Sequence, residues 1–162
     1  MNISTPIDEK IKNELLIDDG EIIKKSLIVS EKLDVYLNDL KVAIKNNFSK
    51  STEDNKYQSK LHGLAWVATY VEALQQMSIW ANELFKNKSF KITERTILIL
   101  SFNEYLNQIF GGIMMSQNEI IRPVDLDYKK AALEKLECED VLFFRDEIDV
   151  DHLRSQLIEL II

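Results

Sequence analysis

Residues 57–85 read YQSKLHGLAWVATYVEALQQMSIWANELF and form the longest uninterrupted helical pattern in the chain. Apolar residues recur along it at steps of four, three, four, three and four, so they share one side of a helix: Trp66, Tyr70, Ala73, Met77, Trp80 and Leu84. A second apolar row lies beside the first: Leu61, Leu64, Ala68, Val71 and Leu74. Because only a narrow polar strip remains, we interpret this segment as a central helix that other helices surround, with both tryptophans in the core.

Two further helices are predicted beside the central one. Ser30 is a good N-cap, and the amphipathic stripe after it runs to Phe48, where a polar loop follows. After the central helix in the sequence, Thr93 and Glu94 begin a helix that is apolar almost all round and runs to about Gln117. The short connection makes this helix antiparallel to the central one.

Gly111 and Gly112 fall inside this last pattern and need an explanation. Two glycines cost roughly 2 kcal/mol of helix propensity relative to alanine. Either two helix backbones approach closely there, or the helix is kinked, or it ends and the following MMSQNEII starts afresh.

The two ends of the chain are less regular. Residues 1–29 form a weakly patterned lead-in, which the sequence Asp18-Asp19-Gly20 interrupts. Toward the other end, Asp125 or Asp127 caps a helix through Leu136, and residues 141–144 form a hydrophobic plug. A last helix, capped at Asp149 or Asp151, still carries apolar positions at the final residue, so the chain looks cut. We therefore divide it into a lead-in at 1–29, a bundle core at 30–126 and acidic C-terminal helices at 127–162.

Composition agrees with an all-α helical bundle. The chain has 162 residues, enough for one domain, and its four glycines and two prolines are too few for a many-turned β-sandwich. Its single cysteine, Cys138, cannot form an intramolecular disulfide. Neither a signal peptide nor a membrane-spanning run is evident. These observations predict a cytoplasmic protein that does not enter the membrane.

The charge of the chain argues against nucleic-acid binding. The net charge is −7, and the segment from Asp125 to Ile162 has eleven acidic and five basic residues. Without a basic stripe the chain lacks the charge that supplies most affinity for phosphate backbones.

A search for catalytic or metal-binding patterns yields little. Ser59 stands three positions before His62, and Asp149 stands three positions before His152. Only the second pair therefore resembles the Glu-x-x-His ligands of a di-iron bundle. A helix cap is the more frequent role for Asp149. Cys138 has acidic neighbours that disfavour a thiolate. We predict no catalytic residue and no metal site in this chain, and leave cofactor-binding residues unassigned.

Two other features of the central helix leave alternatives open. Glu72 lies mid-helix, either buried against Arg95 or Arg122 or solvated on the polar strip. The row that contains Trp66 and Trp80 is either core or a surface on which a flavin stacks.

Two segments resemble a known family: HGLAWVATYVEALQQMSIWA at 62–81 and EYLNQIFGGIMMSQNEIIRPVDL at 104–126. Both are similar to the helical N-terminal extension of a bacterial subfamily of acyl-CoA dehydrogenases, oxidoreductases that act on CH–CH bonds. The resemblance covers roughly Lys60 to Leu126. In that family the extension precedes the flavin-binding domains, which this chain lacks. The resemblance therefore implies FAD only for those domains, and no catalytic residue is carried over.

Two function hypotheses follow. The first is a non-catalytic accessory or assembly domain of an FAD-dependent acyl-CoA dehydrogenase, and the second is a stand-alone helical interaction domain. Direct catalysis by this chain has the least support. The last helix ends in apolar residues that either pair with a second copy or fold back on the bundle: Leu157, Ile158, Leu160, Ile161 and Ile162. We expect a homodimer or contact with a downstream dehydrogenase domain.

Overall fold

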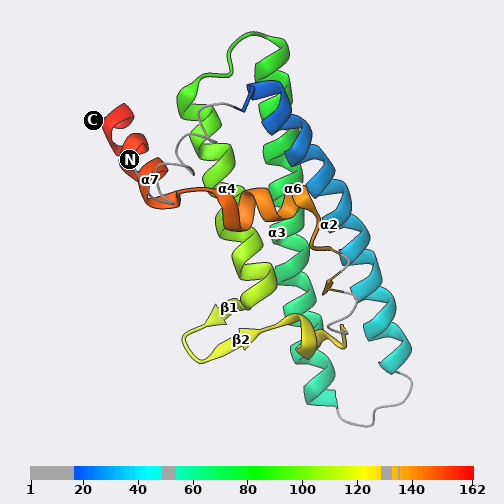
Figure 1. The fold of residues 1–162 in the computed structure, drawn as a ribbon. Helices are drawn as coiled ribbons and strands as arrows, with labels where there is room; N and C mark the ends of the chain where they lie inside the picture. Colours follow the sequence, from blue (N-terminus) through cyan, green and yellow to red (C-terminus); the bar gives the residue numbers. More distant parts are fainter. Residues whose placement is uncertain (1–16, 49–53, 129–132, 135) are drawn as a thin grey trace, which may run out of the picture.

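Three long helices lie side by side in the computed structural model, which describes residues 17–48, 54–128, 133–134 and 136–162 (Figure 1). They are α2 (Asp19–Phe48), α3 (Asp54–Lys86) and α4 (Ile92–Gly111). The Glu94 side chain accepts a hydrogen bond from the Lys91 N–H at 3.0 Å, which supports the start of α4. The predicted all-α bundle with two long antiparallel helices is confirmed.

Helix α2 begins about three turns before Ser30, the residue predicted to cap it. Asp18 supplies the start instead, since its Oδ2 accepts from the Gly20 N–H at 3.1 Å. The Asp-Asp-Gly sequence, interpreted as a break, is thus the helix N-terminus. Ser30 lies inside the helix, where its hydroxyl donates to the Ser26 carbonyl at 2.9 Å and contacts the Ser78 Oγ at 2.9 Å. It therefore links α2 to α3.

Helix α3 buries a line of residues that shares only Val71 and Leu74 with the two apolar rows predicted for it. The line consists of Gly63, Val67, Val71, Leu74, Ser78 and Ala81. Trp66 and Trp80 are half-buried at the edge of the core, against the expectation that they occupy its centre. The open side of α3 is wider than the predicted polar strip. The core itself lies where α2, α3 and α4 meet, around Leu33, Leu40, Leu74, Leu98, Ile99, Phe102 and Leu106.

Helix α4 ends at Gly111, short of the predicted end at Gln117. Gly112 has a φ of +133°, a conformation that glycine adopts without strain, and its N–H donates to the Gln108 carbonyl at 2.8 Å. A two-stranded antiparallel hairpin follows, with β1 (Ile113–Ser116) and β2 (Glu119–Ile121). Of the alternatives for the two glycines, the helix end is correct, but the next segment is a hairpin and no helix.

The hairpin packs on the first turns of α3. A Cβ on Gly63 would stand 2.4 Å from Ile121 Cγ1, so the missing side chain lets β2 approach the helix. The 3₁₀ turn η1 (Pro123–Leu126) comes next and ends at Asp127, whose carboxylate lies 2.6 Å from Lys60 Nζ. Asp127 has a φ of 61° and ends this turn. Most of the helix predicted up to Leu136 falls on residues outside the described ones.

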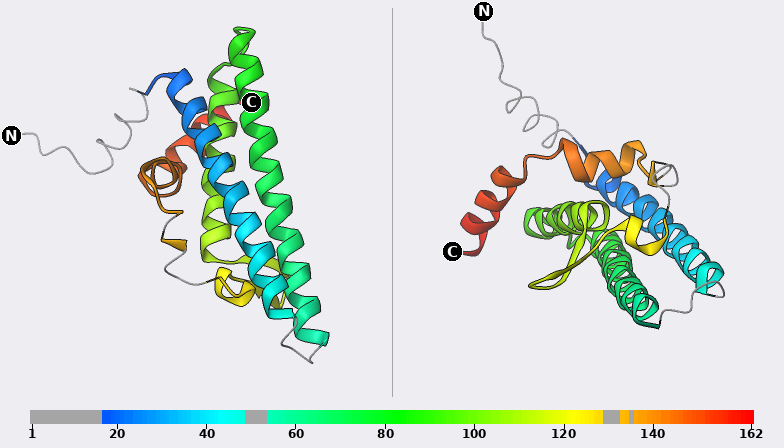
Figure 2. Two further views of the ribbon diagram at one scale, coloured as in Figure 1. Left: turned by 90° about the vertical axis from the view of Figure 1, so that its right-hand side faces the viewer. Right: turned by 90° about the horizontal axis from the view of Figure 1, so that it is seen from below.

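The C-terminal elements lie across the bundle. The short helix α6 (Glu139–Leu142) and the π-helical turn η2 (Phe143–Glu147) cross α2 and α4, as the views of Figure 2 show. Val141, Phe143 and Phe144 are buried, which confirms the predicted hydrophobic plug. Lys25 of α2 reaches Asp140 Oδ1 at 2.9 Å and fixes α6 from the other side.

Helix α7 (Val150–Ile161) completes the described chain beside α4 (Figure 1). Asp149 caps it, as one of the two predicted caps, by accepting from the His152 N–H at 3.1 Å. Our division of the chain into 1–29, 30–126 and 127–162 stays a prediction.

Candidate functional site

The last turns of α7 expose apolar side chains at the surface. Leu153 is buried and fastens the helix to α4, and Arg154 forms an ion pair with Glu104 of α4. Beyond these anchors four large apolar residues are exposed, which we call the α7 apolar face: Ile158, Leu160, Ile161 and Ile162. Their exposed fractions run from 45% for Leu160 to 99% for Ile162. A group of apolar side chains of this kind is typical of a contact surface.

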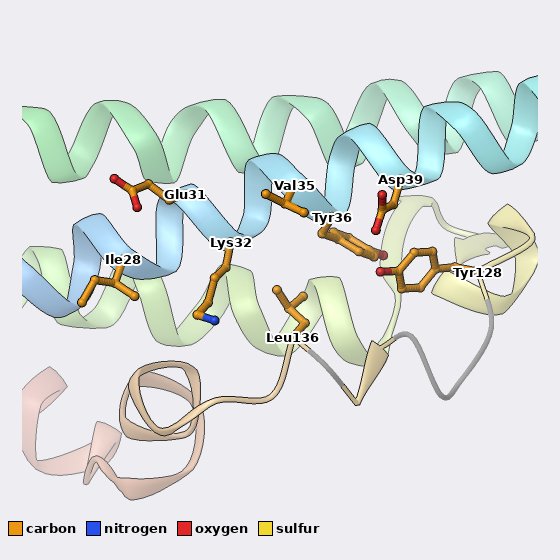
Figure 3. A pocket seen from close by; sticks show the side chains of 8 residues that line it. All are labelled: Ile28, Glu31, Lys32, Val35, Tyr36, Asp39, Tyr128 and Leu136. Carbon is orange, nitrogen blue, oxygen red and sulfur yellow. The ribbon is translucent and has the colours of Figure 1, made fainter.

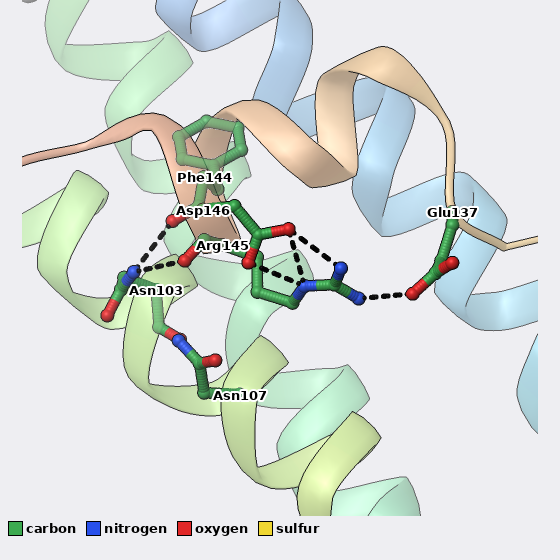
Figure 4. Close-up of polar contacts among 6 residues, drawn as sticks. All are labelled: Asn103, Asn107, Glu137, Phe144, Arg145 and Asp146. Atoms are coloured by element: carbon green, nitrogen blue, oxygen red, sulfur yellow. Dashed lines mark hydrogen bonds and ion pairs between the residues drawn. The ribbon is translucent and has the colours of Figure 1, made fainter. Parts of the chain in front are cut away.

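A polar network fastens the segment that carries α7. The Asn103 side-chain amide on α4 donates to the carbonyls of Phe144 and Arg145, at 2.9 and 3.1 Å (Figure 4). The Phe144 ring packs against Phe102, with ring centroids 4.7 Å apart. Because the amide reaches carbonyl groups of η2, it fixes the backbone of this turn and not only one side chain.

The Arg145 guanidinium occupies the centre of the same network. It lies 2.7 Å from Asp146 Oδ2 and 2.7 Å from Glu137 Oε1, and it stacks over the Phe110 ring at 4.6 Å. The hydrogen bonds that the guanidinium donates to the Asp146 carboxylate are the main cause that raises the pKa of Arg145 above its ordinary value. A guanidinium with two carboxylates and a ring as partners has a structural role. It stabilises the segment that connects α6 to α7.

A pocket of about 500 Å³ opens along α2 on another part of the surface (Figure 3). It is lined by Ile28, Glu31, Lys32, Val35, Tyr36, Asp39, Tyr128 and Leu136. The Tyr36 and Tyr128 rings meet edge to face, with centroids 4.8 Å apart. The sequence pattern placed Tyr36 in a helical stripe and Tyr128 in a separate helix, so it contained no signal that pairs them.

Glu72 and its suggested partners do not meet. Glu72 is exposed and accepts a hydrogen bond from Gln76 at 2.9 Å, which agrees with the solvated-strip interpretation. Arg95 pairs instead with Asp19 of α2, at 2.8 Å. Arg122 uses its backbone N–H to bind Asp125 Oδ2 at 2.8 Å.

The two histidines have local roles. His62 is exposed and accepts from Trp66 Nε1 at 3.1 Å through its Nε2. His152 follows the Asp149 cap, so this pair starts a helix. Cys138 is half-buried and directly precedes α6. Within the described ranges no three His, Cys, Asp or Glu side chains gather closely enough to hold a metal ion.

The aromatic row of α3 faces α4. Tyr70 stacks on Tyr105 with centroids 4.5 Å apart, and its hydroxyl donates to Gln108 Oε1 at 2.8 Å. Trp66 meets the Tyr70 ring edge to face. These contacts support the packing interpretation of the row. No helix in the part of the chain that the structure describes combines the length and apolar character needed to cross a bilayer.

A comparison with curated proteins relates the chain to acyl-CoA dehydrogenases over part of its length. No family model matches the sequence. The (2S)-methylsuccinyl-CoA dehydrogenase of Cereibacter sphaeroides is 46% identical to it over 78 residues. The match covers 48% of this chain but only 14% of the dehydrogenase, so the chain corresponds to a small part of that enzyme's length.

Proposed function

We propose that this chain is a non-catalytic helical accessory domain that assembles with the flavin-binding domains of an acyl-CoA dehydrogenase. The observation that carries the proposal is the 46% identity over 78 residues to (2S)-methylsuccinyl-CoA dehydrogenase. The matched part is 14% of that enzyme, so most of the enzyme lies outside it. A helical segment of this size then acts beside a larger catalytic unit. The helical N-terminal extension of the acyl-CoA dehydrogenase subfamily that this chain resembles is placed in the same way, before the flavin-binding domains.

The lining of the pocket along α2 is a poor fit for FAD. The pocket along α2 is lined by two carboxylates, Glu31 and Asp39, and by one ammonium group, Lys32. A flavin dinucleotide carries a pyrophosphate, which binds where backbone N–H groups or basic side chains face it. An acidic lining is unfavourable for that group. FAD, which the match implies at the level of the family, is therefore assigned to the dehydrogenase domains.

The α7 apolar face is the surface that we assign to the dehydrogenase domain. It rests on a helix that Leu153 and the Arg154–Glu104 ion pair hold against α4, so it is presented in a fixed orientation. The backbone of an ordered helix loses little conformational entropy on binding. A second copy of the chain is the other candidate occupant, and it corresponds to the stand-alone interaction domain.

A hybrid enzyme tests the proposal. This chain would replace the matched segment of the Cereibacter sphaeroides dehydrogenase, and a variant without the segment serves for comparison. We expect the deletion to lower flavin retention or alter the sedimentation coefficient, and the hybrid to restore both. In the hybrid, Ile161→Asp should weaken assembly at least tenfold, because it places a charge in the contact.

The matched control is Val42→Asp, a change of an exposed apolar residue on α2, which should leave assembly unchanged.

Two results would contradict the proposal. A deletion that alters neither flavin content nor assembly would remove the accessory role. Purified chain that retains FAD, or that reduces an electron acceptor in the presence of an acyl-CoA, would show that it is catalytic.

A further inference from the structure

The pocket along α2 is lined by a tyrosine whose hydroxyl has no hydrogen-bond partner among the described residues. Tyr36 is 2% exposed, and its hydroxyl makes no hydrogen bond to any residue that the structure describes. Buried polar groups in folded proteins almost always have a partner, whether protein, water or ligand. The buried Tyr36 hydroxyl is therefore a hydrogen-bonding group in the wall of the pocket that no described residue uses.

The hydroxyl is a donor at neutral pH. Burial raises the pKa of Tyr36 well above its ordinary value near 10, and the neighbouring Tyr128 adds to the shift. The phenol thus keeps its proton under physiological conditions. Figure 3 shows the oxygen ends of Tyr36 and Tyr128 pointing toward the same part of the pocket. An acceptor atom placed there would meet the Tyr36 donor.

The rest of the pocket suits an apolar body. Ile28, Val35 and Leu136 contribute aliphatic surface, and the volume of about 500 Å³ lies within the range of small-molecule sites. The residues that α2 contributes lie on one side of the helix over about three turns. The pocket is consequently an elongated groove with the tyrosine pair toward one end.

The charges around the groove select against an anion. Its charged side chains are Glu31, Lys32 and Asp39, so carboxylates outnumber the ammonium group. After burial, the Asp39 charge is the second cause that raises the pKa of Tyr128, which places this carboxylate close to the tyrosine pair. A carboxylate or phosphate on the ligand would be repelled at the end where the donor lies.

We propose that this groove binds a small uncharged molecule that has an aromatic or alicyclic body and a carbonyl or hydroxyl oxygen, which accepts a hydrogen bond from Tyr36. This inference goes beyond the accessory role, which assigns no part to this face. It also stands apart from the α7 apolar face, since the two surfaces share no residue.

Matched probes test the proposal on the full chain. Acetophenone and ethylbenzene have similar shapes, but only the first carries an acceptor oxygen. Benzoate adds a negative charge to the same ring. Titrations followed by ¹H–¹⁵N NMR should show that acetophenone shifts the Val35 and Tyr36 amide signals and binds more tightly than the other two probes.

The variant Tyr36→Phe removes the hydroxyl and keeps the ring. We expect it to weaken acetophenone binding about tenfold and to leave ethylbenzene binding unchanged, because a single neutral hydrogen bond is lost. Tyr105→Phe, a tyrosine on α4 outside the groove, is the control and should alter neither. If acetophenone binds Tyr36→Phe as well as wild type, or if no probe shifts these signals at millimolar concentration, the proposal is wrong.

Discussion

Single residues in this protein have roles that depend on partners far away in the chain. Ser30 is of a residue type that often caps helices, yet it links α2 to Ser78 of α3. Gly63 sits inside a long helix, where glycine is unfavourable, yet it gives Ile121 the space to pack. In both cases the residue type is explained by a contact between elements.

Gly63→Ala should destabilise the fold by about 1–2 kcal/mol, since the new methyl group overlaps Ile121. The overlap includes the Ile121 Cβ at 3.2 Å, so a rotamer change alone does not relieve it and the hairpin must move. Urea unfolding gives the free energy. Gly111→Ala is the control: apart from its own helical turn, nothing lies within 4 Å of the added Cβ, and stability should stay equal or rise by up to about 1 kcal/mol. Equal effects of the two variants would exclude the proposed packing role.

Tyr36 should make the protein less stable at high pH. Its folded-state pKa is raised above the ordinary value near 10 that applies to the unfolded chain. Above pH 10 the unfolded state therefore loses this proton first, and the free energy of unfolding falls by up to about 1.4 kcal/mol per pH unit. Below pH 9 the contribution is constant. Urea unfolding of wild type and Tyr36→Phe at pH 8, 10 and 11 measures it. Parallel pH profiles would contradict the prediction.

At the scale of elements, the helical pattern identified α3 and α4 because their apolar spacing persists over many turns. It missed the start of α2, since Ser30 satisfies the local rule for a cap while its hydroxyl bonds backward inside the helix. It also missed the hairpin, whose strands of four and three residues are too short to establish an alternating pattern. The groove was not predictable either, because Tyr36 and Tyr128 meet only through the tertiary fold.

Asn103 should be important for the attachment of η2 to α4. Asn103→Ala leaves the Phe144 and Arg145 carbonyls without their donor, which should cost about 1–3 kcal/mol of unfolding free energy. Asn107→Ala is the matched control, because that exposed amide donates to the Asn103 carbonyl on its own helix and to nothing else among the described residues. The control should cost less than about 0.5 kcal/mol. If the two variants unfold at the same urea concentration, the network does not hold the turn.

At the scale of the whole molecule, a buried core and an exposed apolar surface lie on different helices. The bundle buries its core between α2, α3 and α4, whereas the α7 apolar face remains exposed at the end of an acidic segment. A partner that covers this face therefore meets apolar side chains on a segment of net negative charge.

In the absence of dehydrogenase domains we expect the chain to form a homodimer through this face. Sedimentation equilibrium at about 50 µM should give roughly twice the monomer mass of 18.9 kDa. Ile161→Asp should return the mass to that of the monomer without lowering the urea midpoint. Leu153→Ala, in contrast, removes a buried contact and should lower the midpoint. A monomeric wild-type chain would contradict the homodimer.

The ion pair between Lys25 and Asp140 bears on the order in which the protein folds. It joins residues 115 positions apart, whereas α2, α3 and α4 contact one another as neighbours in sequence. Contacts across such separations form late, because the chain between them must first be closed. The three-helix unit should then be largely built in the folding transition state, and α6 should dock after it. Removing the Asp140 carboxylate would consequently accelerate unfolding and leave the folding rate nearly unchanged.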